Sequence, residues 1–98
     1  PHDRVVIFGA GPVGMLGQLV CKATGAQVIM VEPVSYRRQM AMELGADETI
    51  NPIETDVVEQ IQERTDGRGA SLILECSGTD QALAAWICSS SLELVSLR

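Results

Sequence analysis

Short apolar runs recur along the chain, separated by stretches whose apolar residues follow helical spacing. The runs are rich in β-branched residues or leucine, which is typical of strands buried on both faces of a sheet. Strands are predicted over Arg4 to Phe8, Gln27 to Glu32, Glu48 to Ile50, Ser71 to Cys76 and Leu92 to Leu97. This alternation predicts β-α-β units and a parallel sheet covered by helices.

Helices are predicted between these strands, over Pro12 to Thr24, Ser35 to Leu44, a segment marked by Val57, Val58 and Ile61, and Thr79 to about Ser89. The first carries apolar residues at helical spacing, namely Val13, Leu16, Val20 and Ala23, a pattern typical of a crossover helix with one apolar face. Ser35 and Thr79 suit N-caps. Glycines that can end a helix in the left-handed conformation follow at Gly25, Gly45, Gly67 and Gly69. With right-handed crossovers, the prediction is a three-layer α/β domain with parallel strand order 3-2-1-4-5.

A G-x-G-x-x-G stretch, Gly9 to Gly14, follows the first strand and opens the first helix. In such a loop Gly9 permits a tight turn, Gly11 lets a pyrophosphate approach the backbone, and Gly14 allows close packing of helix on strand. Pro12 fits the first helical position, because its N–H would have no intrahelical partner. A phosphate would then depend on the N–H groups of Val13 and Gly14, at the positive end of the helix. The pattern indicates a Rossmann-type dinucleotide site.

Glu32 stands at the end of the second predicted strand, 18 residues after Gly14. A carboxylate at this distance can accept hydrogen bonds from the adenosine ribose hydroxyls, and it would repel a 2′-phosphate. The expected cofactor is therefore NAD rather than NADP. Arg37 and Arg38 follow closely and could partly offset that repulsion, or they could simply be solvated charges on a helix.

Composition excludes several other functions for a chain of this length. The 98 residues suit one domain, with 46% hydrophobic and 20% charged residues and no apolar run that approaches the roughly 20 residues of a membrane span. The net charge of −6 disfavours nucleic acid as a partner. The three cysteines and single histidine show no disulfide framework or zinc spacing. The amino end has no signal-peptide pattern, so a cytoplasmic location is expected.

Four motifs carry a family resemblance: FGAGPVG, then E-x-x-x-x-R from Glu32 to Arg37, then MELGADETINP, then TDGRGASLILECSG. From roughly Arg4 to Leu83 the chain resembles the cofactor-binding domain of the medium-chain, zinc-type alcohol dehydrogenases, with their sorbitol and threonine dehydrogenase relatives. The resemblance implies that residues 1–98 are an NAD-binding fragment of a larger dehydrogenase, which transfers hydride between an alcohol and nicotinamide. The family's catalytic zinc ligands and proton relay lie in a separate domain, so this chain alone is expected to bind the cofactor without catalysis.

The resemblance also implies roles for single residues. Gly9, Gly11 and Gly14, with Pro12, would form the pyrophosphate turn, and Val13 would pack near the nicotinamide. Glu32 would hold the adenosine ribose, with Arg37 beside it. Ser77 and Gly78 match the segment that borders the cofactor after the fourth strand. No catalytic or metal-binding residue is expected within the chain.

Two alternatives and one departure stay open at this point. GAGPVG followed by a strand that ends in VEP is also how many FAD-dependent monooxygenases begin, and a Rossmann module without useful affinity for nucleotides is a second alternative. The carboxyl end reads AAWICSSSLELVSLR where the family has a Gly-Gly turn and further strands. We therefore expect the last strand to be missing and the open sheet edge to promote self-association.

Overall fold

The computed structural model describes residues 3–78 in full and residues 93–96 through their backbone. Along the chain, the strands are β1 (Arg4–Phe8), β2 (Gln27–Val31), β3 (Glu48–Ile50), β4 (Leu72–Glu75) and β5 (Glu93–Ser96). The helices are α1 (Pro12–Ala23), α2 (Ser35–Glu43) and α3 (Val57–Arg64). The fourth predicted helix, Thr79 to about Ser89, lies outside the described residues.

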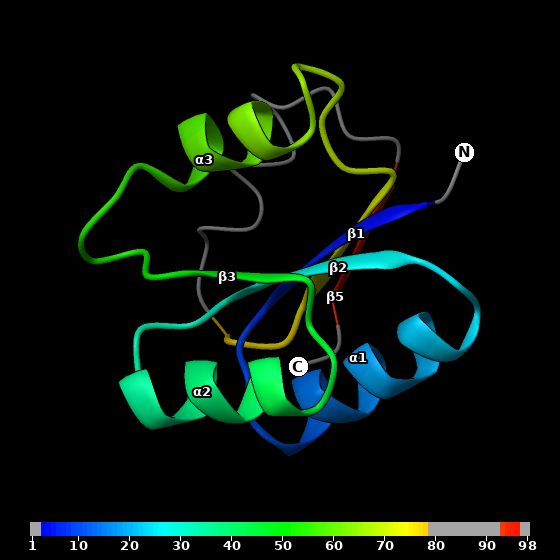
Figure 1. The fold of residues 1–98 in the computed structure, drawn as a ribbon, viewed down its shortest axis with the longest axis vertical. Helices are drawn as coiled ribbons and strands as arrows, with labels where there is room; N and C mark the ends of the chain where they lie inside the picture. Colours follow the sequence, from blue (N-terminus) through cyan, green and yellow to red (C-terminus); the bar gives the residue numbers. More distant parts are fainter. Residues whose placement is uncertain (1–2, 79–92, 97–98) are drawn as a thin grey trace.

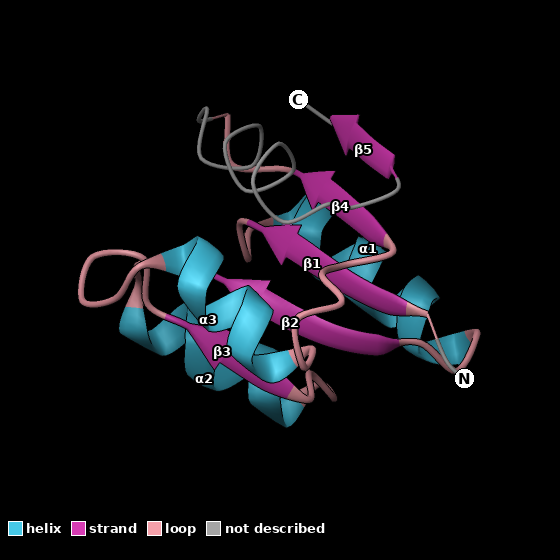
Figure 2. Cartoon of the chain, turned by 90° about the horizontal axis from the view of Figure 1, so that it is seen from above, coloured by secondary structure: helices cyan, strands magenta, loops and turns pink. Residues whose placement is uncertain are grey.

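All five strands run parallel in one sheet, in the order β3-β2-β1-β4-β5 (Figure 2). The predicted order 3-2-1-4-5 is therefore confirmed. β1 is central: Val6 pairs with Ile29 of β2 on one side and with Ile73 of β4 on the other. The direction of strand addition reverses beside β1, and in open parallel sheets a crevice forms at such a reversal, outside the carboxyl ends of the strands.

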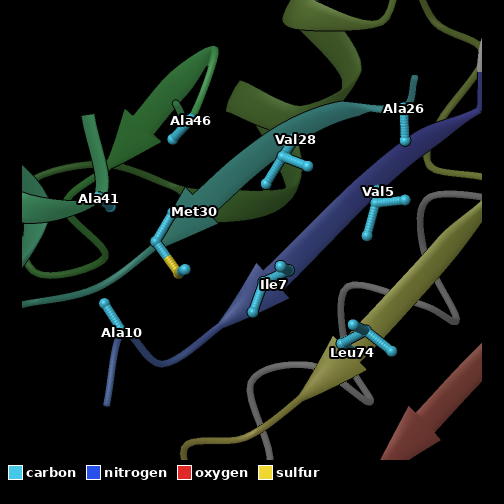
Figure 3. Close-up of a cluster of buried hydrophobic side chains, with 9 residues drawn as sticks. All are labelled: Val5, Ile7, Ala10, Ala26, Val28, Met30, Ala41, Ala46 and Leu74. Carbon is cyan, nitrogen blue, oxygen red and sulfur yellow. The ribbon is translucent and has the colours of Figure 1, made fainter. Parts of the chain in front are cut away.

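Helices cover both faces of the sheet, α1 and α2 on one side and α3 on the other (Figure 1). Alternate residues of the strands divide the core accordingly. In the core on the α3 side of the sheet, the buried apolar residues are Val6, Phe8, Ile29, Val31, Ile50, Ile61, Ala70 and Ile73. In the core on the α1 and α2 side they are Val5, Ile7, Ala10, Ala26, Val28, Met30, Ala41, Ala46 and Leu74 (Figure 3). Because both faces are covered, the continuous apolar runs of the strands are explained.

The end of the second helix is as expected, but its beginning is not. Leu44 is the C-cap of α2, and Gly45 follows with φ 106°, the left-handed value that favours glycine. The N-cap, however, is Val34 and not the predicted Ser35, which is the first helical residue. The Val34 N–H donates to a carboxylate oxygen of Glu32 (2.9 Å). The side chain that organises this turn therefore comes from the strand end, and no serine cap is needed.

The apolar face predicted for the first helix is exposed and does not pack against the sheet. Val13, Leu16 and Val20 are 50%, 63% and 57% exposed, whereas Gly14 and Gln18 are the buried residues of α1. Two features explain the inversion. The glycine face lets the helix approach the sheet closely, and the Gln18 amide donates to the carbonyl of Ala41 in α2 (2.9 Å). The larger apolar side chains are left on the outside, together with Leu19, which is 46% exposed.

We predict that this outer face makes the 98-residue chain self-associate, because large apolar side chains gathered on one helix face are rarely left in water. Leu16→Lys should raise the concentration at which light scattering detects association by several-fold. Gln39→Lys is the matched control, because it adds the same charge at an exposed position of α2. Equal association of both variants would contradict a role for this face.

Candidate functional site

A cavity of about 310 Å³ opens at the carboxyl ends of β1, β2 and β4. This is the strand-order reversal described above. The lining residues are Phe8, Gly9, Gly11, Val31, Glu32, Pro33, Val34, Arg37, Cys76 and Ser77. Five of the nine residues predicted for the site are among them: Gly9, Gly11, Glu32, Arg37 and Ser77. Pro12, Val13 and Gly14 form the first turn of α1 immediately after the lining residue Gly11, and Gly78 follows Ser77.

The three glycines of the turn differ in what surrounds them. A Cβ on Gly9, where φ is 104°, would lie 3.0 Å from the backbone N and Cα of Ser77. A Cβ on Gly14 would lie 1.7 Å from the Gly9 carbonyl oxygen, which no rearrangement of a side chain could relieve. A Cβ on Gly11 would have nothing within 4 Å. Gly9 and Gly14 are thus required by the packing of the protein itself, whereas Gly11 borders open space in the cavity.

The first turn of α1 presents free backbone donors. The first intrahelical hydrogen bond runs from the Met15 N–H to the Gly11 carbonyl (2.9 Å), and Pro12 has no N–H to offer. In the part of the chain that the structure describes, no acceptor receives the N–H of Val13 or Gly14. Unpaired N–H groups and the positive end of the helix dipole favour an anion at this place.

Glu32 follows β2 and is 3% exposed. One of its carboxylate oxygens, Oε1, accepts the Ala10 N–H (2.7 Å), and the other, Oε2, accepts the Val34 N–H (2.9 Å). A carboxylate has about four acceptor positions, so two remain for a ligand in the cavity that Glu32 lines. The side chain therefore joins the glycine turn to the end of β2.

The two arginines after this strand have different surroundings. The Arg38 guanidinium is fixed to the turn after β2, because its Nη1 donates to the backbone carbonyls of Glu32 (2.9 Å) and Pro33 (2.8 Å). Arg37 is exposed and lines the cavity; its Nε donates to the Tyr36 hydroxyl (3.3 Å), and its guanidinium carbon lies 5.9 Å from the Tyr36 ring centroid. The hydrogen bond with Tyr36 is the main reason why the Arg37 pKa is raised. Arg37 is the cation that faces the cavity, and Arg38 supports the turn.

The opposite wall of the cavity lies at the end of β4. Its lining begins at Cys76, one residue before Ser77, the first residue predicted for this side of the site. Cys76 follows the strand and is half-buried. Burial, and then the charge of Glu75, raise the pKa of the Cys76 thiol, so it is a poor nucleophile at neutral pH. Sequence reasoning missed Glu75, which is buried and hydrogen-bonded to the turn that follows it. The available signal was a lone acidic residue at the end of an apolar strand, the same signal that identified Glu32.

A hollow of about 500 Å³ opens at the other end of the sheet and includes Arg4, Lys22, Asp47 and Arg68. Most of its charged groups have structural partners. Arg4 Nε donates to the Gly69 carbonyl (2.9 Å), and Lys22 pairs with Asp47 (2.9 Å). Burial opposes ionisation of Asp47, but hydrogen bonds from the Val28 N–H and from Lys22 outweigh it and lower the Asp47 pKa.

Residues 3–78 hold no cluster of His, Cys, Asp or Glu side chains that could bind a metal. In the same part of the chain, no helix could cross a bilayer.

The chain matches known proteins both in sequence and in fold. Residues 12–89 match the family described as zinc-binding dehydrogenase. The chain is 51% identical over 80 residues to an L-threonine 3-dehydrogenase of Pyrococcus horikoshii, which covers 81% of this chain and 23% of the relative. It is 45% identical over 82 residues to a scyllo-inosose 3-dehydrogenase of Thermotoga maritima, which covers 83% of this chain and 21% of the relative.

Among solved structures, an alcohol dehydrogenase from Thermus sp. ATN1 superposes with a TM-score of 0.83 at 27% identity. That match covers 100% of this chain and 30% of the other. The fold is that of a Rossmann-type cofactor domain. The chain belongs to the zinc-binding, medium-chain dehydrogenase family and spans about a quarter of the length of the curated relatives it matches. It is an NAD(P)-binding domain of this alcohol and polyol dehydrogenase family, and the predicted resemblance is confirmed.

We predict that Gly14→Ala destabilises the fold itself. Its Cβ would overlap the Gly9 carbonyl, and overpacking of this kind costs about 1–3 kcal/mol or more. Urea denaturation would measure the loss. Gly11→Ala is the control, since it is the same substitution three residues earlier, a Cβ there meets nothing within 4 Å and φ is −78°. A loss for Gly14→Ala no greater than that for Gly11→Ala would contradict the prediction.

Proposed function

We propose that residues 1–98 are the NAD-binding domain of a zinc-type alcohol or polyol dehydrogenase. The observation that carries the proposal is the free N–H pair of Val13 and Gly14 at the start of α1, beside a cavity on whose rim the carboxylate of Glu32 is fixed. Donors for an anion and acceptors for a diol within one cleft match the two ends of an adenosine diphosphate.

In this proposal the pyrophosphate lies at the first turn of α1, close to Gly11, where the backbone carries no side chain toward the cavity. Glu32 accepts hydrogen bonds from the adenosine ribose with the acceptor positions that Ala10 and Val34 leave unused. Ser77 and Gly78 border the cofactor on the β4 side, and Val13 lies toward the nicotinamide. The bound dinucleotide supplies hydride chemistry, and this domain binds and orients it.

The charge distribution favours NAD over NADP. The Glu32 carboxylate is buried, and neither of its two hydrogen bonds comes from a cation. Its negative charge would repel a ribose 2′-phosphate. Arg38 donates to backbone carbonyls and supports the turn, which leaves Arg37 as the only basic side chain in the described lining of the cavity. One exposed guanidinium offsets only part of the repulsion from a buried carboxylate.

The reaction belongs to the whole enzyme of which we propose this chain is a part. The described residues do not form a zinc site, so they do not fit the catalytic metal of the family, and no catalytic step is assigned to them. We further propose a cytoplasmic setting and subunit pairing at the edge of the sheet where β5 lies. Membership of the dehydrogenase family, together with the β-α-β alternation beyond β2, favours this function over the FAD-dependent alternative.

We predict that the 98-residue chain binds NADH at least about tenfold more tightly than NADPH, a difference of about 1.4 kcal/mol. It should not oxidise alcohols. Titration calorimetry and nicotinamide fluorescence would measure the binding, and absorbance at the NADH band would measure turnover. Tighter binding of NADPH would contradict the cofactor preference. If neither nucleotide bound, the domain would be a Rossmann scaffold without a binding function. A yellow flavin in the purified protein would favour the FAD alternative.

Gly11→Ala separates binding from folding. Its Cβ meets no protein atom within 4 Å, and φ at Gly11 is an ordinary −78°, so the free energy of unfolding should change little. The methyl group would stand where the pyrophosphate is proposed to approach, and NADH affinity should fall by about tenfold or more. Calorimetry on the variant, with a urea unfolding curve as its stability control, makes the measurement. Unchanged affinity would place the nucleotide elsewhere.

A further inference from the structure

The carboxylate of Glu75 organises the wall of the cavity opposite Glu32. Glu75 is the last residue of β4 and is 3% exposed. Its Oε1 accepts the Ser77 N–H (2.7 Å), the Ser77 hydroxyl (2.5 Å) and the Gly78 N–H (2.9 Å). Three donors that converge on one buried oxygen fix the direction in which the chain leaves the strand.

The turn that Glu75 holds is in direct contact with the glycine turn. The ideal Cβ position on Gly9 lies 3.0 Å from both N and Cα of Ser77, so a Cβ there would be closer to this backbone than ordinary van der Waals contact. Ser77 and Gly9 both line the cavity, and Glu75 itself does not. A change in the path of the Ser77 turn would therefore move a wall of the cavity and release the contact that confines Gly9.

Glu75 and Glu32 lie within one residue of the same level in the sheet. Phe8 of β1 pairs with Glu75 on one side and with Val31, the residue before Glu32, on the other, so both carboxylates lie near the level where β1 gives way to the glycine turn. Glu32 ties the Ala10 N–H and the Val34 N–H together. Glu75 ties down the turn of the neighbouring strand. The glycine turn is thus held between two segments, each anchored by a buried carboxylate.

We infer that Glu75 is a positioning residue for dinucleotide binding: it holds the Ser77–Gly78 turn against Gly9 and so fixes the width of the cleft. This inference rests on the proposed function. It assigns Glu75 no contact with the ligand, because its Oε1 is occupied by the turn and the side chain does not line the cavity.

The test compares three variants of the 98-residue chain by NADH titration and by urea unfolding. Glu75→Ala leaves the Ser77 and Gly78 N–H groups without their acceptor, and we expect NADH affinity to fall by about tenfold. Glu75→Gln keeps an oxygen at the Oε1 position, and we expect affinity within about threefold of the unchanged chain. Asp47→Ala removes a carboxylate that likewise holds a backbone N–H, that of Val28, at the far end of the sheet, and should leave NADH affinity unchanged.

The outcomes separate the inference from the proposed function. If the unchanged chain fails to bind NADH, the proposed function fails and this inference fails with it. If the unchanged chain binds NADH and Glu75→Ala binds it equally well, only the inference is overturned. Loss of affinity in Asp47→Ala as large as in Glu75→Ala, or no rescue by Glu75→Gln, would also overturn it.

If Glu75→Ala does not fold, a measurement on the unchanged chain tests the inference about Glu75 instead. Hydrogen exchange followed by NMR reports on the N–H groups of Ser77 and Gly78 directly. A turn that forms the cleft wall should exchange more slowly when NADH is bound, while the Val28 N–H, held by Asp47, should show no change beyond that of the whole fold. Equal effects at the two places would contradict the inference.

Discussion

Close contact between the Gly9 carbonyl and Gly14 is the constraint on which the rest of the site depends. An ideal Cβ on Gly14 would overlap that carbonyl oxygen, so only a glycine lets α1 begin directly above the end of β1. With α1 in this place, the free N–H groups of its first turn directly follow Gly11, which lines the same cavity as Glu32. The contact also explains the inverted packing of the helix, because the small side of α1 must lie against the sheet.

The cavity combines backbone donors that favour an anion with buried carboxylates that would repel one. The chain carries a net charge of −6 and places two carboxylates, Glu32 and Glu75, in buried positions around a turn suited to an anion. Each of them accepts at least two hydrogen bonds within its own segment or from the glycine turn, which stabilises its charge without drawing on the N–H groups of α1. The donors of the helix start and the acceptors at the strand ends therefore remain separate in space.

Sequence patterns predicted the sheet, its order and five of the residues that line the cavity, because these depend on local and chemically specific signals. A glycine that must take φ 104°, as Gly9 does, or an acidic residue at the end of an apolar strand, as Glu32 is, can be recognised without knowledge of neighbours. The face of α1 could not be predicted by the same means. Apolar spacing reports which side chains avoid water in general, whereas Gly14 and Gln18 decide the packing through backbone approach and a hydrogen bond to α2. Glu75 carries the same strand-end signal, but it was overlooked because no glycine motif precedes it at a characteristic spacing and its partners lie within its own turn.

The pairing of β1 with β4 has a consequence for how the site comes into existence. β1, β2 and β3 are neighbours both in sequence and in space, and they can assemble by short local connections. The bond from the Arg4 N–H to the Ser71 hydroxyl, by contrast, joins residues 67 positions apart. Because closing so long a loop costs chain entropy before any contact compensates for it, β4 is expected to join late in folding. A growing polypeptide would thus hold its glycine turn well before it holds a complete cleft, and competence to capture a nucleotide would arise in the final step of assembly.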